Sequence, residues 1–486
     1  MEVDIDNPEP DLLDSPEAGG VAIRGVLVRT VLFAAGLIVS LITVPFLVRH
    51  LGPVEWGYYV SVTAIVAVIA GITEGGLTNL GIRYYSTEHD PVARGEIVRN
   101  LIGVRLVATT VAIALVTAVA ALAGAAREIV LGLPLFGLGT VLTMMFSTYA
   151  VPLQAQLRLG LTAGLEFARQ TANAVGTIAL IVAGAGLYAF FGYWAVVCGG
   201  ITVVTALIVR RTIPILPGFD WPTWRRFLGD AVAYGVASAA GLVYFRMGAS
   251  LMTFLSTDLE TGYFGVAFRV LETGAMVPWL LVTSVFPILA RAATTDRSRL
   301  RYATQRVVEV GLIVGVAMTL VLVVGAKPVI QVIGGAEFRD AVPVLRVQGL
   351  VLIATVFVST WSLLLLSLDE QRILLAINGS AVVLTFAAAF VLIPPLGAIG
   401  GSLDVLLAEV LVAVSFVVVL WRRHPDVAPD LRPLWRIAVA ALVAAAASLP
   451  FGDVIATAVA VVVYALLLLA LRAIPMELWD ALRRSR

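Results

Sequence analysis

Residues 30–48 read TVLFAAGLIVSLITVPFLV, a run of apolar side chains that contains no charged residue. A helix of about 20 apolar residues is long enough to cross the hydrocarbon core of a bilayer. Similar runs recur along the whole chain, which is 60% hydrophobic and only 13% charged, with a mean hydropathy of +0.98. The sequence therefore predicts an all-α polytopic membrane protein.

Hydropathy predicts fourteen spans in the 486 residues, and no connector between them exceeds about 20 residues. Because so little chain lies outside the spans, there is no room for a soluble catalytic domain, and we expect the protein not to be an enzyme. The predicted spans are 30–48, 57–80, 100–123, 129–152, 171–190, 193–209, 228–254, 262–289, 307–326, 342–366, 373–393, 398–420, 434–449 and 454–471.

Basic residues outside the spans are distributed unequally between the two sides of this topology. With a cytoplasmic N-terminus, 25 of them are cytoplasmic and four are on the outer side. Cytoplasmic loops of membrane proteins are enriched in Lys and Arg. We therefore expect both termini in the cytoplasm. Residues 1–22, which are rich in acidic side chains and prolines, are predicted to be a disordered acidic cytoplasmic tail.

Several classes of chemistry are excluded by composition. The balance of 33 basic and 32 acidic residues argues against a nucleic-acid partner. A single cysteine, Cys198, and three histidines far apart in the chain argue against a metal site. The chain contains no P-loop, G-x-S-x-G or H-E-x-x-H motif. We therefore predict no catalytic residues and no cofactor, which leaves transport or a scaffold within the membrane.

A short motif occurs twice. Gly57-Tyr58-Tyr59 opens the second predicted span, and Gly262-Tyr263-Phe264 opens the eighth. An even number of spans between the copies gives two lobes of the same orientation, related by an axis along the membrane normal, with a substrate cavity between them. The alternative is that aromatic residues after glycine simply mark a membrane interface.

Three stretches resemble one family. Residues 49–59, RHLGPVEWGYY, resemble the connector after the first span of the polysaccharide flippases, the Wzx-type branch of the multidrug/oligosaccharidyl-lipid/polysaccharide exporter superfamily. Residues 335–346, GAEFRDAVPVLR, resemble the family's approach to span ten, and residues 393–401, IPPLGAIGG, its turn between spans eleven and twelve. The resemblance extends over residues 22–472.

The resemblance implies two six-helix lobes around a V-shaped central cavity, with two C-terminal helices appended. The implied divisions are 23–210 for spans one to six, 211–421 for spans seven to twelve, and 422–486 for spans thirteen and fourteen with a cytoplasmic tail. The implied activity is movement of a polyprenyl-diphosphate-linked oligosaccharide from the cytoplasmic to the outer leaflet of the plasma (inner) membrane by alternating access, during cell-surface polysaccharide biosynthesis. A polysaccharide polymerase or glycosyltransferases would be the protein partners.

Arginines within the spans are the candidate cavity cations. A charge at the bilayer centre costs about 2.5–3.5 kcal/mol on insertion scales, and a guanidinium pairs well with phosphate oxygens. Arg246 and Arg269 are placed at similar depth by the antiparallel spans seven and eight. Arg269 lies three residues before Glu272, which would pair with it on the same helix.

Three further arginines complete the set of predicted cavity cations. Arg29 lies at the inner end of span one, where an anchoring role explains it equally well. Arg105 and Arg346 lie close to span ends, and for both we favour snorkelling to the interface over a place in the cavity.

Acidic residues within spans are candidates for coupling to H⁺ or Na⁺. Glu74 lies in a glycine-rich stretch, residues 71–76, where close backbone approach is expected. Glu272 and Asp404 are the other two candidates. Asp404 and Glu409 are five residues apart on one helix and face different directions.

Three alternatives to the flippase remain open. A cation-coupled multidrug exporter of the same superfamily would carry an acid in span one or seven, whereas span one has none and span seven has Arg246. A peptidoglycan-precursor flippase would carry several arginines within spans one and two. A non-transporting membrane partner of a glycosyltransferase complex would tolerate loss of Arg246 and Arg269.

Overall fold

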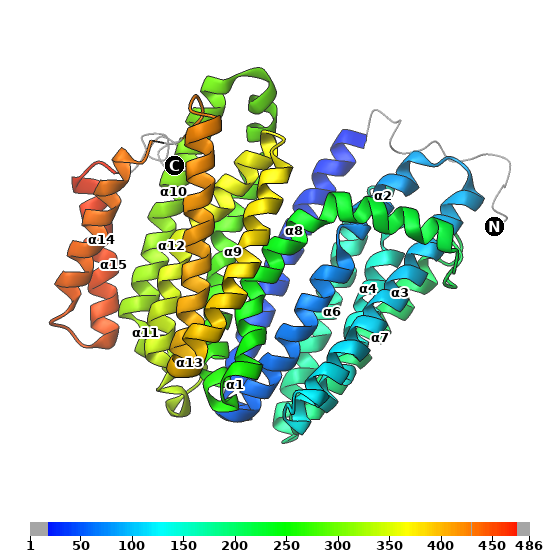
Figure 1. Cartoon of the computed structure of the whole chain (residues 1–486), viewed down its shortest axis with the longest axis horizontal. Helices are drawn as coiled ribbons and strands as arrows, with labels where there is room; N and C mark the ends of the chain where they lie inside the picture. Colours follow the sequence, from blue (N-terminus) through cyan, green and yellow to red (C-terminus); the bar gives the residue numbers. More distant parts are fainter. Residues whose placement is uncertain (1–17, 429, 474–486) are drawn as a thin grey trace. The chain divides into compact units, whose positions relative to one another are not determined.

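The computed structural model describes residues 18–428 and 430–473, with side chains throughout these ranges except at 18–27, 232–240, 242, 287, 288 and 433. The described residues form helices and connectors without a strand (Figure 1). The elements in chain order are α1 (Ala18–Glu74), α2 (Leu77–Thr87), α3 (Pro91–Leu122), α4 (Arg127–Tyr149), α5 (Val151–Ala155), α6 (Leu159–Val182), α7 (Leu187–Val209), α8 (Trp221–Leu255), α9 (Asp258–Thr295), α10 (Arg297–Val324), α11 (Ala326–Ile333), η2 (Ala336–Phe338), α12 (Ala341–Ser367), α13 (Gln371–Arg423), η3 (Arg432–Leu434), α14 (Trp435–Ser448) and α15 (Asp453–Ala470).

The predicted membrane character is confirmed. In the described part of the chain, nine helical stretches are long and apolar enough to cross a membrane. Two of them, Val28–Thr87 with 60 residues and Gln371–Arg423 with 53, are long enough to cross twice, since one crossing needs about 20 residues. The protein is therefore an all-α polytopic membrane protein, and the predicted spans other than the fifth lie largely on helical residues.

Two glycines divide the longest helices into predicted pairs of spans. Gly52 in α1 has φ 69° and Gly397 in α13 has φ 54°, a left-handed backbone that favours glycine. After Gly397, the amide of Ala398 donates to Oε2 of Glu260 at 2.8 Å, which satisfies a donor at the start of the new helix. Both turns fall in the connectors that the sequence predicted.

The fifth predicted span was placed wrongly. The sequence predicted 171–190, whereas α6 is Leu159–Val182. The chain leaves the helix at Gly184, which has φ 68°, and the amide of Ala185 donates back to the carbonyl of Leu180 at 3.0 Å. Hydropathy missed the first half of α6 because that half contains Glu166 and Arg169, which neutralise each other in an ion pair.

The described chain forms two compact units. The first comprises the residues up to Leu51 together with Val62–Ala239, and the second comprises Gly52–Ser61 together with the residues from Ala240 onward. The short segment Gly52–Ser61, at the first turn of the chain, therefore belongs to the second unit. The divisions 23–210, 211–421 and 422–486 remain a prediction from the resemblance.

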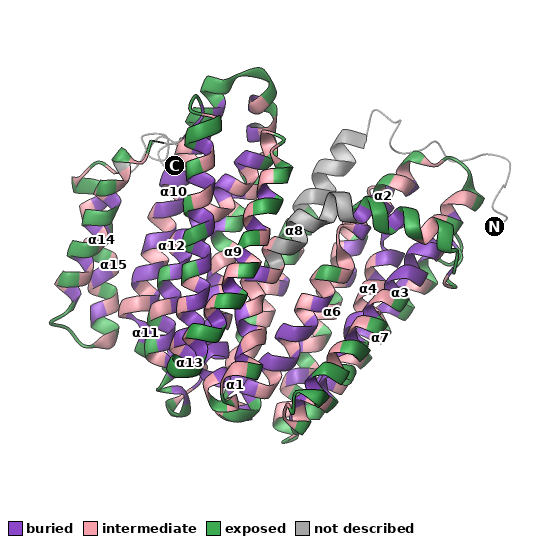
Figure 2. Cartoon of the chain, in the orientation of Figure 1, coloured by how far each residue is buried: buried purple, intermediate pink, exposed green. Residues whose placement is uncertain are grey.

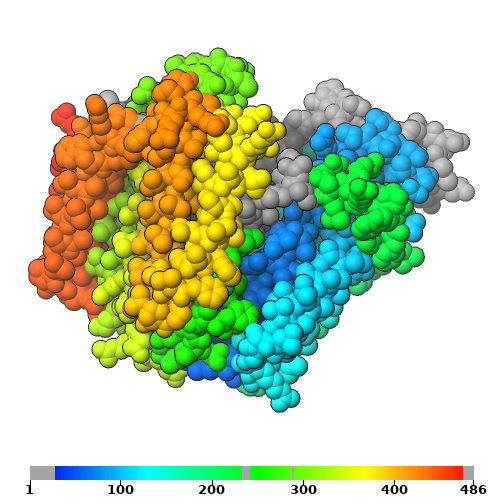
Figure 3. Space-filling view, viewed as in Figure 1, coloured from blue at the N-terminus to red at the C-terminus, as the bar shows by residue number. Residues whose placement is uncertain are grey.

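Each unit has its own apolar core (Figure 2). In the first unit, Leu77, Leu101 and Phe227 belong to one buried cluster. In the second unit, a cluster that includes Leu374 and Phe416 joins the two halves of α13, which lie side by side in yellow and orange in Figure 3. Many large apolar residues on the outer surfaces are exposed, which is the pattern of helices that face lipid.

The appended helices α14 and α15 pack against α10 through a third buried cluster that includes Val316, Ala444 and Tyr464. The hydroxyl of Tyr464 donates to the carbonyl of Ile313 at 3.2 Å. At the other end of α15, Lys327 and Asp453 form an ion pair at 2.5 Å. The last two helices are therefore attached to the second unit along their length.

The two copies of the repeated motif meet inside the second unit. A Cβ added to Gly57 would overlap the carbonyl oxygen of Asp258, and a Cβ added to Gly262 would overlap the carbonyl oxygen of Pro53. Asp258 and Pro53 each precede the partner glycine by four residues. The contact is therefore reciprocal, which agrees with two copies of one structural repeat.

Candidate functional site

Arg246 and Arg269 lie on neighbouring antiparallel helices, α8 and α9, which are joined by a connector of two residues. The side chain of Thr257 in that connector accepts a hydrogen bond from the amide of Glu260 and caps α9. At 1.5 Å per residue, both arginines lie roughly 14–17 Å from the connector along their helices. The prediction that they share one depth therefore agrees with the structure.

The carboxylate of Glu272 joins the two arginines. Its Oε1 accepts from Arg246, and its Oε2 accepts from Nη1 of Arg269 at 3.0 Å. The side chain of Glu272 is 13% exposed, whereas those of Arg246 and Arg269 are 28% and 42% exposed. One carboxylate thus holds two guanidiniums that keep part of their surface open. We refer to Arg246, Glu272 and Arg269 as the arginine triad.

The arginine triad carries a net positive charge, because a single acid is shared by two permanently charged arginines. Each guanidinium has five N–H donors, and one carboxylate cannot use them all. Some donors therefore remain for an anion of phosphate-like geometry, while the donors that bind Glu272 are withheld from it. The helical pairing of Arg269 with Glu272, foreseen from their spacing, is present but does not neutralise the site.

Arg105 lies in a different place from the one predicted. The expectation that it reaches the interface is wrong, because the side chain is completely buried. Its Nη2 donates to Glu74 and to the hydroxyl of Thr78, both at 2.7 Å, and its Nη1 donates to the hydroxyl of Thr148 at 2.8 Å. A buried guanidinium with these partners braces α1, α2, α3 and α4 against one another and exposes no surface to a substrate.

The same ion pair changes the interpretation of Glu74. Its Oε2 accepts a hydrogen bond from Nη2 of Arg105. Its Oε1 accepts one from the backbone amide of Thr78 at 3.1 Å, just after the break between α1 and α2 at Gly75 and Gly76. The side chain is one-third exposed, so one edge of the carboxylate remains accessible. Its geometry resembles a structural brace at a helix break more than a free carboxylate.

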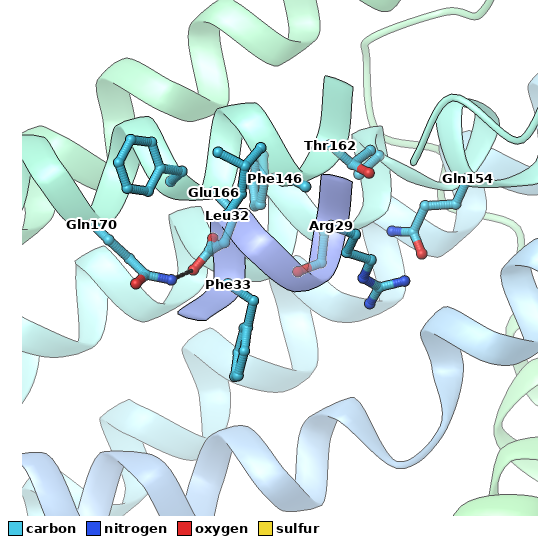
Figure 4. A pocket seen from close by; sticks show the side chains of 12 residues that line it. Arg29, Leu32, Phe33, Phe146, Gln154, Thr162, Glu166 and Gln170 are labelled. Atoms are coloured by element: carbon cyan, nitrogen blue, oxygen red, sulfur yellow. Dashed lines mark hydrogen bonds between the residues drawn. The ribbon is translucent and has the colours of Figure 1, made fainter. Parts of the chain in front are cut away.

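The other two predicted cations lie in ordinary positions. Arg346 is exposed in the second turn of α12, and its place at the interface stays a prediction. Arg29 is exposed on α1 and forms part of the lining of a pocket between α1, α4, α5 and α6 in the first unit (Figure 4). Arg29 therefore lines a pocket of the first unit, whereas Arg246 and Arg269 belong to the second unit.

Asp404 is the acid that the structure singles out. Its side chain is completely buried in the second unit, and neither carboxylate oxygen has a hydrogen-bond partner among the described residues. Glu409, also buried, accepts from Tyr244 at 3.0 Å and from Thr355 at 3.4 Å. No cation neutralises either acid within the described residues, whereas Glu74 and Glu272 both pair with arginine.

Comparison with known proteins gives the family. Residues 22–293 match the family model described as polysaccharide biosynthesis protein. The chain belongs to this family. No curated protein matches the sequence.

Solved structures show the fold that this polysaccharide biosynthesis protein shares. The lipid II flippase MurJ in its inward closed conformation has 12% identity and a TM-score of 0.74, covering 91% of this chain and 98% of that one. An inward-facing multidrug resistance MATE family transporter of the MOP superfamily has 16% identity and a TM-score of 0.64, covering 80% and 94%. The chain therefore shares its fold with these two membrane proteins.

Sequence reasoning missed the polar residues of the pocket beside Arg29. Glu166 and Gln170 on α6 line the pocket and form one hydrogen-bonded group with Arg169, with Arg169 Nε at 2.9 Å and Gln170 Nε2 at 2.9 Å from the Glu166 carboxylate. The only signal in the sequence was the spacing of Glu166 and Arg169 at i and i+3.

Among the described residues, no group of three or more His, Cys, Asp or Glu side chains is arranged to hold a metal ion.

Proposed function

We propose that this polysaccharide biosynthesis protein is a flippase. It moves a polyprenyl-diphosphate-linked oligosaccharide from the cytoplasmic to the outer leaflet of the plasma (inner) membrane by alternating access, with both termini in the cytoplasm. The observation that carries the proposal is the arginine triad, which places two partly exposed guanidiniums around one carboxylate on membrane helices. Family membership and the transporter fold agree with it.

The chemistry of the triad suits a diphosphate. Guanidiniums bind phosphate oxygens through paired N–H donors and stay charged at any physiological pH. Glu272 keeps both arginines oriented while the site is empty, so little side-chain entropy is lost when the headgroup arrives. The carboxylate also competes with the headgroup for the same donors, which limits affinity and permits release on the other side.

Asp404 supports a role for a coupling ion. Burying an ionised carboxylate without a partner is very unfavourable, so this position favours a neutral acid or an acid that holds a cation. A change of conformation that wets Asp404 would release that proton or cation. We propose Asp404 as the coupling residue, ahead of Glu74 and Glu272, because those two already pair with arginines.

The test is mass spectrometry of polyprenyl-linked intermediates in a deletion strain. The wild-type gene should clear an accumulated lipid-linked oligosaccharide, and Arg246→Ala/Arg269→Ala should not clear it despite normal insertion. Arg269→Lys should restore part of the activity, because lysine keeps the charge but loses the planar fork. Arg301→Ala, an exposed arginine at the start of α10, serves as the matched control and should behave as wild type.

Two other outcomes would replace the proposal. A deletion strain with no lipid-linked intermediate but higher sensitivity to cationic drugs would identify a multidrug exporter. Full activity of the Arg246→Ala/Arg269→Ala variant at normal expression would exclude the triad from translocation and favour a non-transporting partner of glycosyltransferases.

A further inference from the structure

The first unit contains a pocket of about 250 Å³ that is separate from the arginine triad (Figure 4). Its lining combines polar and aromatic side chains from α1, α4, α5 and α6, all within one compact unit. A pocket of this volume encloses one sugar ring with an attached group, and the rest of a longer ligand would lie outside it.

One end of this pocket is positively charged. Arg29 has no ion-pair partner among the described residues. The acid of the pocket, Glu166, is already neutralised by Arg169, whose Nη2 lies 2.5 Å from Oε1. Because the charges of Glu166 and Arg169 cancel, the positive charge of Arg29 is not compensated within the lining of the pocket. The pocket therefore favours a ligand with an anionic group at the Arg29 end.

The opposite end is a fixed set of hydrogen-bonding groups. Glu166 accepts from Arg169 and from Gln170, which orients both its carboxylate and the Gln170 amide. The amide oxygen of Gln170 rests against Gly36 of α1, where a Cβ would overlap it. In Figure 4, Glu166 and Gln170 lie at one side of the pocket, and Arg29 and Gln154 lie at the other.

The remaining lining residues complement the two kinds of surface of a pyranose ring, its apolar C–H groups and its polar hydroxyls. Phe33, Phe146 and Phe167 offer apolar faces for ring C–H groups. Gln154 and Thr162 add an amide and a hydroxyl that reach sugar hydroxyls. A small pocket with aromatic walls and a few oriented polar groups is typical of a specific small-molecule site.

We propose that this pocket binds a glycosyl phosphate: one sugar ring between the aromatic side chains and the Glu166–Gln170 group, with its 1-phosphate at Arg29. The inference rests on the proposed function, because the sugar attached to the diphosphate of the lipid-linked cargo carries this chemistry. The pocket therefore reads the identity of the first sugar, whereas the arginine triad binds the headgroup without regard to sugar. Arg29 acts as a phosphate ligand here and not only as a membrane anchor.

The single cysteine makes a direct binding test practicable. In a Cys198→Ser background, Ala163→Cys places one thiol in the pocket lining. The rate of maleimide labelling of the purified protein is then measured with 1-phosphates of glucose, galactose, N-acetylglucosamine and N-acetylgalactosamine, with the free sugars, and with inorganic phosphate. Ala336→Cys, in the exposed η2 turn of the second unit, is the matched control.

We expect at least one glycosyl phosphate to slow labelling of Cys at position 163 at a concentration about tenfold lower than its free sugar or phosphate. Arg29→Ala should remove the advantage of the glycosyl phosphate over the free sugar. Gln154→Ala should weaken protection by both. Labelling of the control at position 336 should not change with any probe.

Protection by inorganic phosphate as strong as by every glycosyl phosphate would overturn the inference, because the pocket would then be a simple anion site. Absence of protection by all probes would overturn it as well. Neither result touches the flippase proposal, which is decided independently by the lipid-linked intermediates of the deletion strain and by the triad variants.

Discussion

Gly57 and Gly262 lie close against each other. A Cβ added to Gly57 would be 3.2 Å from the amide nitrogen of Gly262, and a Cβ added to Gly262 would be 3.4 Å from the amide nitrogen of Gly57. These are the shared glycines of the two motif copies, 205 residues apart in the chain. Neither position has room for a methyl group, because a carbonyl oxygen of the other helix fills the space. The internal repeat is therefore used as a backbone contact inside the second unit.

Gly262→Ala should destabilise the protein. The new methyl group overlaps the carbonyl of Pro53, so the two segments must separate, and overpacking of this kind costs about 1–3 kcal/mol of unfolding free energy. Thermal unfolding of the purified protein should show a lower midpoint. Gly200→Ala in α7 is the control, because a Cβ there meets nothing within 4 Å and alanine favours the helix. Equal midpoints for Gly262→Ala and wild type would contradict the contact.

Glu74→Gln should be more damaging than Arg105→Met. The first change leaves a completely buried guanidinium without its carboxylate, and breaking a buried ion pair costs about 3–5 kcal/mol. The second leaves a carboxylate that is one-third exposed and can still be solvated. The measurement is denaturant or thermal unfolding of each variant in the same detergent.

The double variant Glu74→Leu/Arg105→Met provides the control for this pair. Replacing both charges by apolar groups removes the desolvation penalty together with the attraction, so stability should return to near the wild-type value. A loss in the double variant equal to the sum of the losses of Glu74→Leu and Arg105→Met, each measured alone, would show that the two side chains act independently, contrary to the observed ion pair. Retained transport in a stable double variant would assign Glu74 to structure and not to ion coupling.

Most of the fold follows from properties that are local in the sequence. Apolar runs of the length of a bilayer predict helices, and Gly52 and Gly397 sit in the predicted connectors because their positive φ suits the turns. The boundary of α6 was missed for an equally local reason. The charges of Glu166 and Arg169 lower the hydropathy of a helix in which they neutralise each other.

The candidate site depends on pairings that the sequence does not record. Arg105 meets Glu74 across 31 residues, and Arg246 meets Glu272 across 26. Near a span end, the sequence does not distinguish an arginine in a buried ion pair from an arginine that reaches the interface. The prediction for Arg105 was wrong for this reason. Arg246 and Arg269 were placed at similar depth because consecutive spans run in opposite directions and a short connector joins them, so residue counts give the depth.

Glu272→Gln should bind the diphosphate headgroup more tightly than wild type. The amide cannot form the two ion pairs of the carboxylate, so both guanidiniums become available to the ligand. Losing a competing charged hydrogen bond of about 1.5 kcal/mol corresponds to about tenfold in affinity. Native mass spectrometry with undecaprenyl diphosphate measures the affinity.

Glu309→Gln is the matched control for Glu272→Gln. Glu309 pairs with Arg306 at 2.7 Å on α10, in the same unit but outside the arginine triad. Its substitution should leave the affinity for undecaprenyl diphosphate unchanged. Weaker binding by Glu272→Gln would mean that the carboxylate positions the arginines for the ligand and does not compete with it.

Asp296 at the start of α10 should give a pH-dependent stability. Hydrogen bonds from Ser298 and from the amide of Arg299 hold the pKa of the Asp296 carboxyl below its ordinary value of 3.8. A folded-state pKa below the unfolded value stabilises the protein above the unfolded pKa, and this contribution is lost as the pH falls through the folded pKa. Asp296→Ala should therefore lower the unfolding temperature at pH 7, and the difference from wild type should shrink below pH 4. A difference that stays constant with pH would exclude the ionised cap.

Asp404→Asn should uncouple transport from the ion gradient without unfolding the protein. Asparagine has the size of the acid, and since neither carboxylate oxygen has a partner among the described residues, no hydrogen bond to them is lost. In proteoliposomes, an imposed pH gradient should accelerate wild-type translocation of the lipid-linked cargo and leave the Asp404→Asn rate unchanged. Asp453→Asn, which alters an exposed ion pair with Lys327, should keep the response to the gradient.

Exchange of Na⁺ for K⁺ at constant pH separates the two candidate ions, because only a sodium site would lose its response. If Asp404→Asn responds to both gradients as wild type does, its burial is a feature of the core, and coupling must be sought at Glu409, the other buried acid without a cation among the described residues.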